Sequence, residues 1–296
     1  MGRPERGVDL PAPDHPGPVG DRGSRILGGL RVEGVRGVVI AVVSTVVFFT
    51  ALVLIVVSSP GWPAIRESFF NGAVFADTFP RIARSFLKNI AIFMTAEVFI
   101  LIFAMFLAVL RSLPGPVFFP VRLLATAYTD LFRGIPTVLV IFLLGFGAPT
   151  LGLQGVPKSP FFWGVASLVL VYSAYVAEVY RAGIDSVHPS QVAAARSLGL
   201  GRWQSLRFVV IPQAVRRVIP PLLNDFIGLQ KDTALVALIG PVEAFRQSQI
   251  RTADAFNYTP YLATALLFIL LTVPLARLTD WLIARERRRR QAGAAL

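Results

Sequence analysis

The sequence contains no cysteine and only two histidines, His15 and His188, which lie far apart in the chain. Without thiols the chain can hold neither disulfides nor thiolate metal sites. The two histidines have no second ligand or nucleophile nearby in sequence, so they do not suggest a metal site or a catalytic triad. We therefore expect no catalytic residue, metal site or cofactor-binding residue in this chain.

Lysine is almost as rare, occurring only at Lys88, Lys158 and Lys231, and none of these follows a glycine. A phosphate-binding loop of the G-x-x-x-x-G-K-[ST] type requires that glycine–lysine pair, so the sequence contains no such loop. If ATP drives the activity of this protein, another polypeptide must hydrolyse it. An enzyme is the least favoured class.

Charged residues make up only 16% of the 296 residues, whereas 54% are hydrophobic. A typical soluble domain carries about 25% charged residues. The apolar residues gather in runs of about twenty, long enough to cross a hydrocarbon core as helices and without the alternation of barrel strands. We predict an all-α polytopic membrane protein, whose net charge of +12 marks cytoplasmic loops and not a nucleic-acid-binding surface.

The chain is predicted to cross the membrane six times. The third crossing is expected to break at Gly134-Ile135-Pro136, because proline removes a backbone donor and kinks a helix. The fifth crossing is the most polar. The predicted membrane segments are residues 38–57, 89–110, 117–148, 161–180, 218–239 and 261–283.

Three further segments flank or separate these helices. Residues 1–36 are rich in Pro, Gly, Arg and Asp and predict a disordered cytoplasmic tail, and the first apolar run starts too late for a cleavable signal peptide. Residues 58–88 mix aromatic and charged side chains, which is typical of an external segment at the lipid headgroups. Residues 285–296 begin with an arginine-rich run and predict a basic cytoplasmic tail held by anionic lipids.

The distribution of arginine predicts the orientation. The central loop, residues 178–217, has six arginines against two acids, and the tail from residue 284 has five against one. Residues 149–160 carry a single lysine, and residues 241–259 balance two arginines with two acids. The mildly positive 58–88 segment is a contrary signal. By the positive-inside rule, both termini and the central loop are expected in the cytoplasm.

The central loop is predicted to form two short helices joined by glycines. Ser190, after His188-Pro189, is expected to cap an alanine-rich helix over residues 191–198, which Gly199 ends in a left-handed conformation. A second, amphipathic helix begins at Arg202, and Pro212 is expected to close it. Spacing alone leaves two interpretations about even: a knob that docks into another protein, or a helix lying on the membrane surface.

The sequence motifs favour the first interpretation. Ala194-Ala195, Gly199, Val209 and Ile211-Pro212 have the spacing of the EAA loop and resemble that of importer-type ABC permeases. In that family the loop carries the coupling helix, which sits in a cleft of the ATP-binding subunit. The resemblance spans about residues 65–285 and extends to the branch that imports polar amino acids, through Phe132–Pro136 (FRGIP), Ala177–Ile184 (AEVYRAGI), Pro221–Ile227 (PLLNDFI) and Lys231–Leu235 (KDTAL).

The resemblance implies a permease subunit that carries a polar amino acid. Its partners would be two ATP-binding subunits, a second copy or a related permease, and an external solute-binding protein. Residues 89–284 would form the five-helix core with a coupling loop at 181–217, and the helix at 38–57 would be an addition. The loop positions that the resemblance assigns to coupling are Ser190, Gln191, Ala193, Ala194, Ala195, Arg196, Gly199 and Pro212.

Two positions depart from the family pattern. Ala193 stands where the family has the glutamate of EAA, and Ile135 stands where it often has threonine. If Ser190 caps the helix, Ala193 is its third residue, so the reciprocal capping box and one anionic docking contact are both lost. The docking contacts would then differ from those of the family.

Polar residues inside the predicted helices are the remaining functional candidates, because they are costly in lipid. Glu97 would accept the ammonium of an amino acid, or it would form a structural hydrogen bond to another helix, which is the better default. Arg133 would line a cytoplasmic vestibule or sit among headgroups. Four residues on the fifth segment, Asn224, Asp225, Lys231 and Asp232, would line the path or its gate, or would form an internal lysine–acid pair.

Two other classes of protein compete with the importer subunit. A self-contained secondary transporter or channel would need internal repeats or an embedded ion site, and the sequence shows no convincing duplication. Such a protein would also leave the central loop without a role. A membrane-embedded enzyme ranks last because the sequence offers no nucleophile–base pair or metal-ligand cluster.

Overall fold

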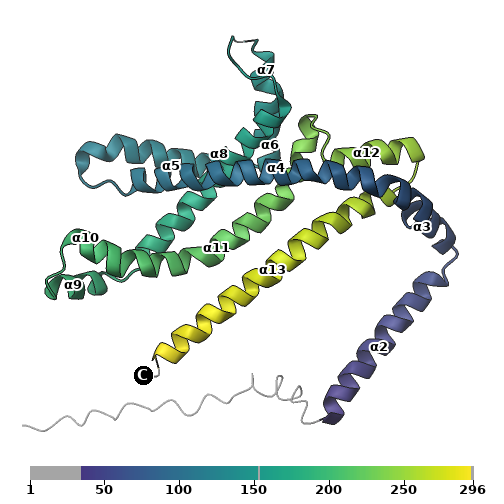
Figure 1. The fold of residues 1–296 in the computed structure, drawn as a ribbon, viewed down its shortest axis with the longest axis horizontal. Helices are drawn as coiled ribbons and strands as arrows, with labels where there is room; N and C mark the ends of the chain where they lie inside the picture. The colour runs from purple at the N-terminus through teal and green to yellow at the C-terminus, as the bar shows by residue number, and fades with distance from the viewer. Residues whose placement is uncertain (1–34, 153, 295–296) are drawn as a thin grey trace, which may run out of the picture. The chain divides into compact units, whose positions relative to one another are not determined.

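The structure is a computed structural model that describes residues 35–152 and 154–294, and its regular elements in these ranges are all helical (Figure 1). The chain divides into two compact units, residues 1–62 and residues 63–296. Residues 1–34 of the predicted disordered tail lie outside the described residues. The predicted all-α fold is confirmed for the part of the chain that the structure describes.

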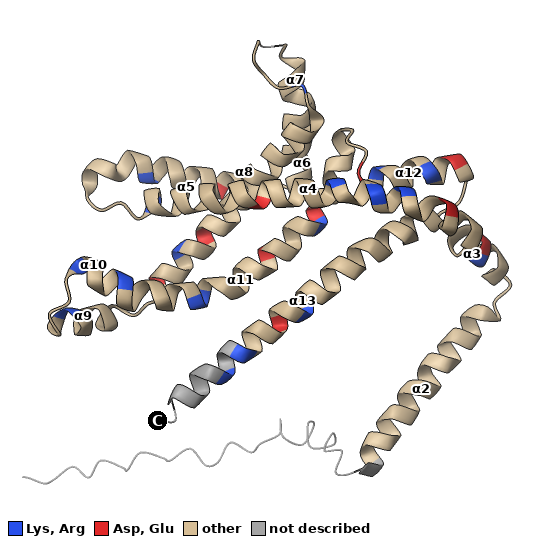
Figure 2. Ribbon diagram, in the orientation of Figure 1, with Lys and Arg blue, Asp and Glu red and all other residues tan. Residues whose placement is uncertain are grey.

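The first unit contains one long helix, α2, from Val35 to Val57. No residue from 38 to 57 is buried within the described chain, and none of these residues has a charged side chain (Figure 2). Its side chains are largely β-branched, and a helix with apolar residues on all sides is suited to lipid. This agrees with the predicted segment 38–57.

The second unit consists of helices and short π- and 3₁₀-helical segments. Its elements are α3 (Trp62–Phe69, which starts at the unit boundary), α4 (Gly72–Arg111), η2 (Pro116–Phe118), α5 (Phe119–Gly134), α6 (Thr137–Phe142), η3 (Leu143–Gly147), α7 (Ala148–Thr150), α8 (Pro160–Asp185), α9 (Pro189–Ser197), α10 (Arg202–Ser205), η4 (Leu206–Val210), α11 (Ile211–Asp232), η5 (Thr233–Ile239), α12 (Ala244–Ala255) and α13 (Thr259–Ala294).

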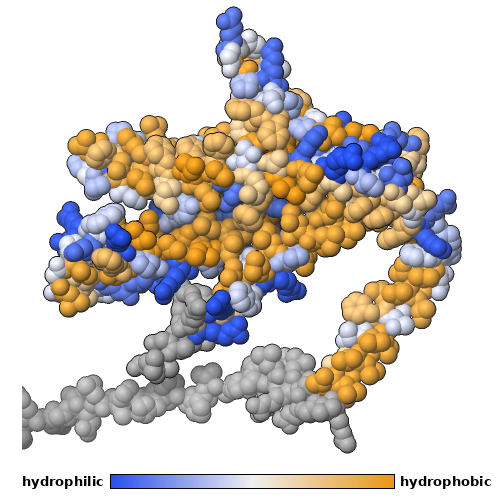
Figure 3. Space-filling view, viewed as in Figure 1, coloured by the Kyte–Doolittle hydropathy of each residue, from blue (hydrophilic) through white to orange (hydrophobic). Residues whose placement is uncertain are grey.

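Among the described residues, four helical stretches are long and apolar enough to cross a membrane. They are Gly37–Val57, Trp62–Arg111, Pro160–Asp185 and Thr259–Arg285. A fifth is added if the pair Pro116–Gly134 and Thr137–Thr150, bent by 103°, counts as one broken span. Figure 3 shows the apolar residues that cover much of the visible face, with hydrophilic residues gathered over α12 and around α9 and α10.

The break in the third predicted segment is confirmed at the expected place. Helix α5 ends at Gly134, Ile135 is extended, and α6 starts after Pro136. Pro136 cannot donate a backbone hydrogen bond and disfavours a helical conformation in the residue before it, which favours a break at Ile135. The side chain of Tyr175 on α8 donates to the carbonyl of Arg133 beside the break.

The fifth predicted segment, 218–239, differs from a single apolar span. Helix α11 starts earlier, at Ile211, and from Thr233 the chain tightens into the 3₁₀ segment η5. Thr233 Oγ1 donates to the Gln230 carbonyl at 2.8 Å, which fits this tighter winding. This helix is not among the stretches apolar enough to cross, so six crossings stay a prediction.

Helices also occupy two stretches that lie outside the predicted membrane segments. In the predicted interfacial segment 58–88, α3 occupies Trp62–Phe69 and α4 already begins at Gly72. The Asn71 side chain caps α4 by accepting hydrogen bonds from two backbone N–H groups at 3.1 Å, which explains the early start. Within 241–259, Glu243 caps α12 in the same way.

The main core lies where α8 packs between α4 and α11, and glycine allows the closest approach. A Cβ atom on Gly183 of α8 would lie 2.0 Å from Val218 Cγ2 and 3.3 Å from the Ala214 carbonyl oxygen on α11. Protein interiors leave no room for such an overlap. The glycine therefore sets the spacing between the two helices that carry the central loop.

Substituting this glycine should cost stability. Gly183→Ala is expected to lower the free energy of unfolding by about 1–3 kcal/mol through overpacking, and Val218→Ala in the same chain should restore part of it. Gly147→Ala is the control, because a Cβ there meets nothing within 4 Å. Thermal unfolding in detergent measures the stability of Gly183→Ala and of the control Gly147→Ala. Equal effects of the two substitutions would contradict the close packing.

Candidate functional site

The central loop forms the expected helix–glycine–helix. Helix α9 ends at Ser197, and Gly199 follows with φ of 85° in the left-handed region. The N–H of Leu200 bonds the Ala195 carbonyl at 3.2 Å, which closes the turn. The chain then enters α10 at Arg202. The predicted role of Gly199 as the end of the first helix is confirmed.

The predicted cap of the first helix was wrong by two residues. His188 is the N-cap, its Nδ1 accepts the Ser190 N–H at 3.2 Å, and Pro189 is the first helical residue. Proline suits this position because its missing N–H would have no partner there. Ser190 lies inside the first turn, with its hydroxyl 2.7 Å from His188 Nδ1.

This shift changes the meaning of Ala193. Counted from the His188 cap, the third helical residue is Gln191 and Ala193 is the fifth, so no capping box is lost at Ala193. Ala193 and Ala194 are exposed, whereas Ala195 is buried against the loop. What remains of the departure from the family pattern is the absence of a carboxylate on the exposed side of α9.

Pro212 does not close the second helix, contrary to the prediction. Helix α10, the π-helical segment η4 and α11 follow one another without a gap from Arg202 to Asp232. Pro212 has no N–H to offer the carbonyl four residues earlier, and the π-helical turn before it is where the hydrogen-bond register changes. The loop is therefore joined rigidly to α11.

The exposed surface of the loop combines large apolar side chains with an arginine. Leu198, Trp203 and Phe208 are 84%, 66% and 63% exposed, and the coupling candidate Arg196 is exposed next to them. Both predicted interpretations, a docking knob and a membrane-surface helix, need such a surface.

A cluster of ion pairs that the sequence did not predict joins three helices at Glu178. Arg111 of α4 donates to Glu178 Oε2 at 2.6 Å, and Arg181 donates to Oε1 at 2.5 Å. Arg133 of α5 lies 3.9 Å from the same carboxylate, so the vestibule candidate is found in this cluster. The Arg111 and Glu178 side chains are only 11% and 23% exposed. The acid thus fixes α4, α5 and α8 to one another just before the loop.

The path candidates Arg133 and Asp225 lie on the same cavity. This cavity of about 420 Å³ between α8 and α11 also contains Glu178 and Arg217. Asp225 Oδ2 is buried without a hydrogen-bond partner among the described residues. The half-buried Glu97 of α4 lies close enough to Asp225 for their charges to repel. The structure thus brings Glu97, Asp225 and Arg133 into one region.

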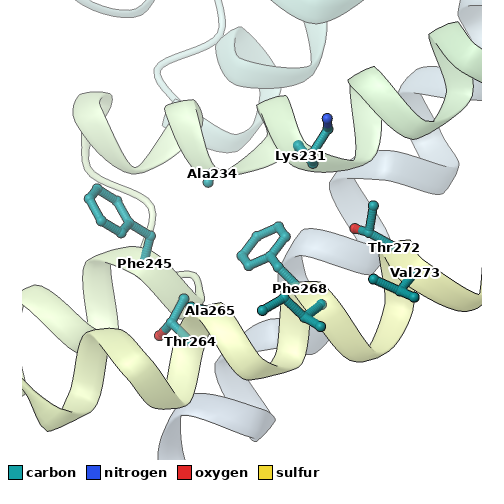
Figure 4. Close-up of a pocket in the computed structure, with 9 residues that line it drawn as sticks. Lys231, Ala234, Phe245, Thr264, Ala265, Phe268, Thr272 and Val273 are labelled. Atoms are coloured by element: carbon teal, nitrogen blue, oxygen red, sulfur yellow. The ribbon is translucent and has the colours of Figure 1, made fainter. Parts of the chain in front are cut away.

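The remaining candidates on α11 face different neighbours. Asp232 accepts a hydrogen bond from the Tyr172 hydroxyl of α8 at 2.9 Å. Lys231 lines a cavity of about 380 Å³ against α13, together with Phe268 and Thr272 (Figure 4). Asn224 is exposed. Within residues 35–152 and 154–294, no acid is placed within 4 Å of Lys231, so the alternative lysine–acid pair is not formed there.

A second buried acid, Glu243, was not predicted from the sequence. It is fully buried outside the candidate membrane spans and caps α12 by accepting the N–H groups of Phe245 and Arg246 at 2.9 and 2.7 Å. Asn89 of α4 donates to it at 2.7 Å. Burial raises the pKa of the Glu243 carboxyl, and these hydrogen bonds oppose that shift. The group anchors α12 to α4.

Comparisons with known proteins agree with this geometry. The family model of the binding-protein-dependent transport system inner membrane component matches residues 115–288. The probable glutamine ABC transporter permease protein GlnM of Bacillus subtilis is 35% identical over 161 residues, which cover 54% of this chain and 73% of that protein. The nopaline transport system permease protein NocQ of Agrobacterium fabrum is 37% identical over 166 residues, 52% of this chain and 70% of that protein.

Solved structures are similar over a larger part of the chain. A crystal structure of an amino acid ABC transporter with histidines superposes with a TM-score of 0.66 at 30% identity, covering 73% of this chain and 98% of that chain. The MetNI methionine ABC transporter in an inward-facing conformation gives a TM-score of 0.54 at 18% identity, covering 69% of this chain and 95% of that chain, and shows the fold alone.

Proposed function

The chain belongs to the family of binding-protein-dependent transport system inner membrane components, and on this premise we propose that it is the permease subunit of an ATP-driven importer of polar amino acids. The observation that carries this proposal is the helix–glycine–helix loop, which is exposed, cationic and rigidly joined to α11. The sequence contains no phosphate-binding loop, so the ATP is hydrolysed by a partner chain.

We propose the assembly that the family implies. Two ATP-binding subunits dock on the loops of two permeases, which are two copies of this chain or this chain and a related one. A solute-binding protein delivers the amino acid from the outside. Lipid surrounds the apolar helices, and nucleic acid has no part. Membrane embedding is supported by the candidate spans, and the amino acid substrate is supported by the name of GlnM, a probable glutamine ABC transporter permease.

We further propose that the protein lies in the bacterial plasma membrane with six crossings and both termini in the cytoplasm. In Figure 1, the loop end of α11 and the carboxyl end of α13 point to the same side, as this orientation requires. The division into a tail (1–36), an added helix (38–57), an external segment (58–88), a transport domain (89–284) and a basic tail (285–296) follows from it.

A copurification experiment tests the proposal. Coexpression with an ATP-binding subunit from the same organism should give a complex that stays intact in detergent. The same ATP-binding subunit should be lost when residues 190–199 are replaced. A chain that purifies alone, whatever ATP-binding subunit is offered, would contradict the proposal. Uptake by this chain in liposomes without ATP or partners would favour the alternative, a self-contained secondary transporter or channel.

Glu97 gives a prediction about the substrate. A carboxylate on the path would bind the positive charge of a basic amino acid, so Glu97→Gln is expected to lower uptake of arginine or histidine by about tenfold or more and to affect glutamine less. Asp77→Asn, exposed on the same helix, is the matched control. Competition uptake assays measure the ratio of arginine or histidine uptake to glutamine uptake in each variant. Unchanged arginine and histidine uptake would remove Glu97 from the path.

A further inference from the structure

A surface that is expected on the outside of the membrane is formed by α12 and the first half of α4. Asn89 of α4 donates a hydrogen bond to Glu243, at the start of α12, at 2.7 Å. The N–H of Asn71, which caps the start of α4, donates to Thr259 Oγ1, shortly after the end of α12, at 3.1 Å. The two helices therefore run antiparallel and side by side. The surface that they share, here the α4–α12 surface, consists of the exposed side chains of residues 77–88 and 244–256.

The α4–α12 surface is cationic. Arg81, Arg84 and Lys88 follow one another at spacings of three and four residues, so they share one exposed face of α4. Arg246 of α12 is also exposed, and its guanidinium donates to the neutral side chain of Gln249 at 3.0 Å. Figure 2 shows basic residues of the two helices beside one another.

The acids of this surface do not cancel its charge. Asp77 lies 3.9 Å from Arg81, and Asp254 lies 3.6 Å from Arg251, so each of these acids is matched by a cation. Glu243 is fully buried beneath the surface, where it accepts backbone hydrogen bonds from α12. The exposed side chains therefore leave an excess of positive charge.

This excess has no explanation within the part of the chain that the structure describes. Neither Arg84 nor Arg246 has a carboxylate within 4 Å among residues 35–152 and 154–294. Cations on the outside also run against the tendency of membrane proteins to keep arginine in the cytoplasm. A partner that carries negative charge would account for them, because interfaces place opposite potentials against each other.

An aromatic side chain projects from one end of the same surface. Phe256 follows α12, is 93% exposed and has a φ of 49°, the one positive value outside glycine in the described residues. Such a backbone is costly for a bulky residue and needs support. The buried Asn257 supplies it, because its side chain donates to the Glu67 carbonyl at 2.7 Å and its N–H to the Thr252 carbonyl at 3.3 Å. The ring is thus fixed outward before any partner arrives.

We infer that the α4–α12 surface docks an acidic surface of the solute-binding protein, with Phe256 as the aromatic anchor in a pocket of that protein. Aromatic anchors dominate protein interfaces, and an anchor that is already fixed pays little ordering entropy on binding. This inference rests on the proposed function and adds the place and the chemistry of the contact.

A lipid surface fits these two helices less well. A helix that lies on a membrane has a broad apolar face. Helix α12 contains only two large apolar side chains, Phe245 and Ile250, among arginines, glutamines and small residues. It is also outside the stretches that are apolar enough to cross a membrane. The helix is therefore suited to a partner in water.

Binding of a solute-binding protein from the same organism to the permease complex in nanodiscs tests the anchor. Phe256→Asn is expected to raise the Kd on the order of tenfold or more. Asparagine adopts the left-handed conformation more readily than phenylalanine, so thermal unfolding should stay unchanged or shift upward. Phe256→Trp should keep the Kd within about threefold, because the anchor remains. Val117→Ala is the control, since Val117 is 82% exposed but lies outside the α4–α12 surface. Equal Kd values for Phe256→Asn and Val117→Ala would overturn the inference.

The charge of the surface gives a second readout. Arg84→Gln is expected to raise the Kd by about threefold or more and to flatten its dependence on salt, because ions screen exposed charge pairs. Lys158→Gln is the matched control, because Lys158 is an exposed cation in the other segment expected outside. It should change the Kd less than about twofold. The same salt dependence in both variants would overturn the acidic partner.

The other outcomes are also decisive. If brominated phospholipids in the nanodisc quench the added emission of Phe256→Trp, measured against the unsubstituted chain, the ring lies in lipid and the inference is overturned. If the unsubstituted complex binds a solute-binding protein but all variants bind equally, the inference fails and the proposed function stands. If the unsubstituted complex binds no solute-binding protein of the organism, the proposed function fails, and the inference fails with it.

Discussion

Replacing residues 190–199 with a Gly-Ser linker of equal length is expected to abolish ATP-driven uptake while the chain still inserts in the membrane. The replaced segment contains most of α9 and Gly199, and nothing of the buried core apart from Ala195. A flexible linker keeps the connection to α10 but removes the rigid surface that we propose docks on the ATP-binding subunit. Uptake in proteoliposomes should fall to the level measured without ATP.

Single alanine substitutions test whether coupling depends on the conformation of the loop, because they leave the loop in place. Gly199 has φ of 85°, in the left-handed region, whereas Gly201 has φ of −63°. A Cβ atom added at Gly201 would meet no atom closer than 3.5 Å. Gly199→Ala should therefore cost about 1–2 kcal/mol of local stability and reduce the uptake obtained per ATP hydrolysed. Gly201→Ala should change neither the local stability nor the uptake per ATP hydrolysed. Normal uptake after the linker replacement, or equal effects of the two alanines, would show that the loop does not couple ATP to transport.

Glu178→Gln is expected to have the second largest effect. The substitution keeps the size of the side chain but removes the negative charge that faces Arg111, Arg133 and Arg181. Removing one partner of a buried ion pair leaves the other charges uncompensated. Because the Glu178 side chain keeps 23% exposure, we expect a loss of about 3 kcal/mol in the free energy of unfolding, at the low end of the range for buried pairs.

The consequence for transport follows from where this cluster lies. It ties α4 and α5 to α8 just before the chain enters the loop, so motion of the loop should reach the other helices less completely in Glu178→Gln. The ratio of uptake to ATP hydrolysis measures this. Asp185→Asn is the control, because Asp185 also binds Arg181 but is 59% exposed, where a pair contributes little. Equal losses in both variants would contradict the role of Glu178.

Local rules predicted much of the loop and of the helices. Proline after Ile135 disfavours a continuous helix at this point, and glycine at 199 permits a left-handed turn, so both features were predicted from the sequence. The prolines inside α4, α11 and α13 show that such a break is a local preference that packing can override. The N-cap residue of α9 could not be predicted in this way. His188 and Ser190 both offer an acceptor near Pro189, and their competition is decided by a geometry that the sequence does not contain.

Long-range interactions were beyond prediction for a different reason. Glu178 meets Arg111 across 67 residues, and Glu243 meets Asn89 across 154. Each acid looked like an ordinary loop charge, because burial and partners arise only when helices pack. The sequence signal that existed for Glu178 was its place inside the stretch AEVYRAGI, at the end of an apolar helix.

The central claim is that this chain converts the ATP hydrolysis of a partner into uptake. The most direct measurement reconstitutes it with its ATP-binding subunit and solute-binding protein in liposomes and follows a labelled polar amino acid. The account predicts accumulation that requires ATP on the side of the membrane where the ATP-binding subunit lies and that stops when residues 190–199 are replaced. Accumulation that persists without ATP, or with the loop replaced, would contradict it.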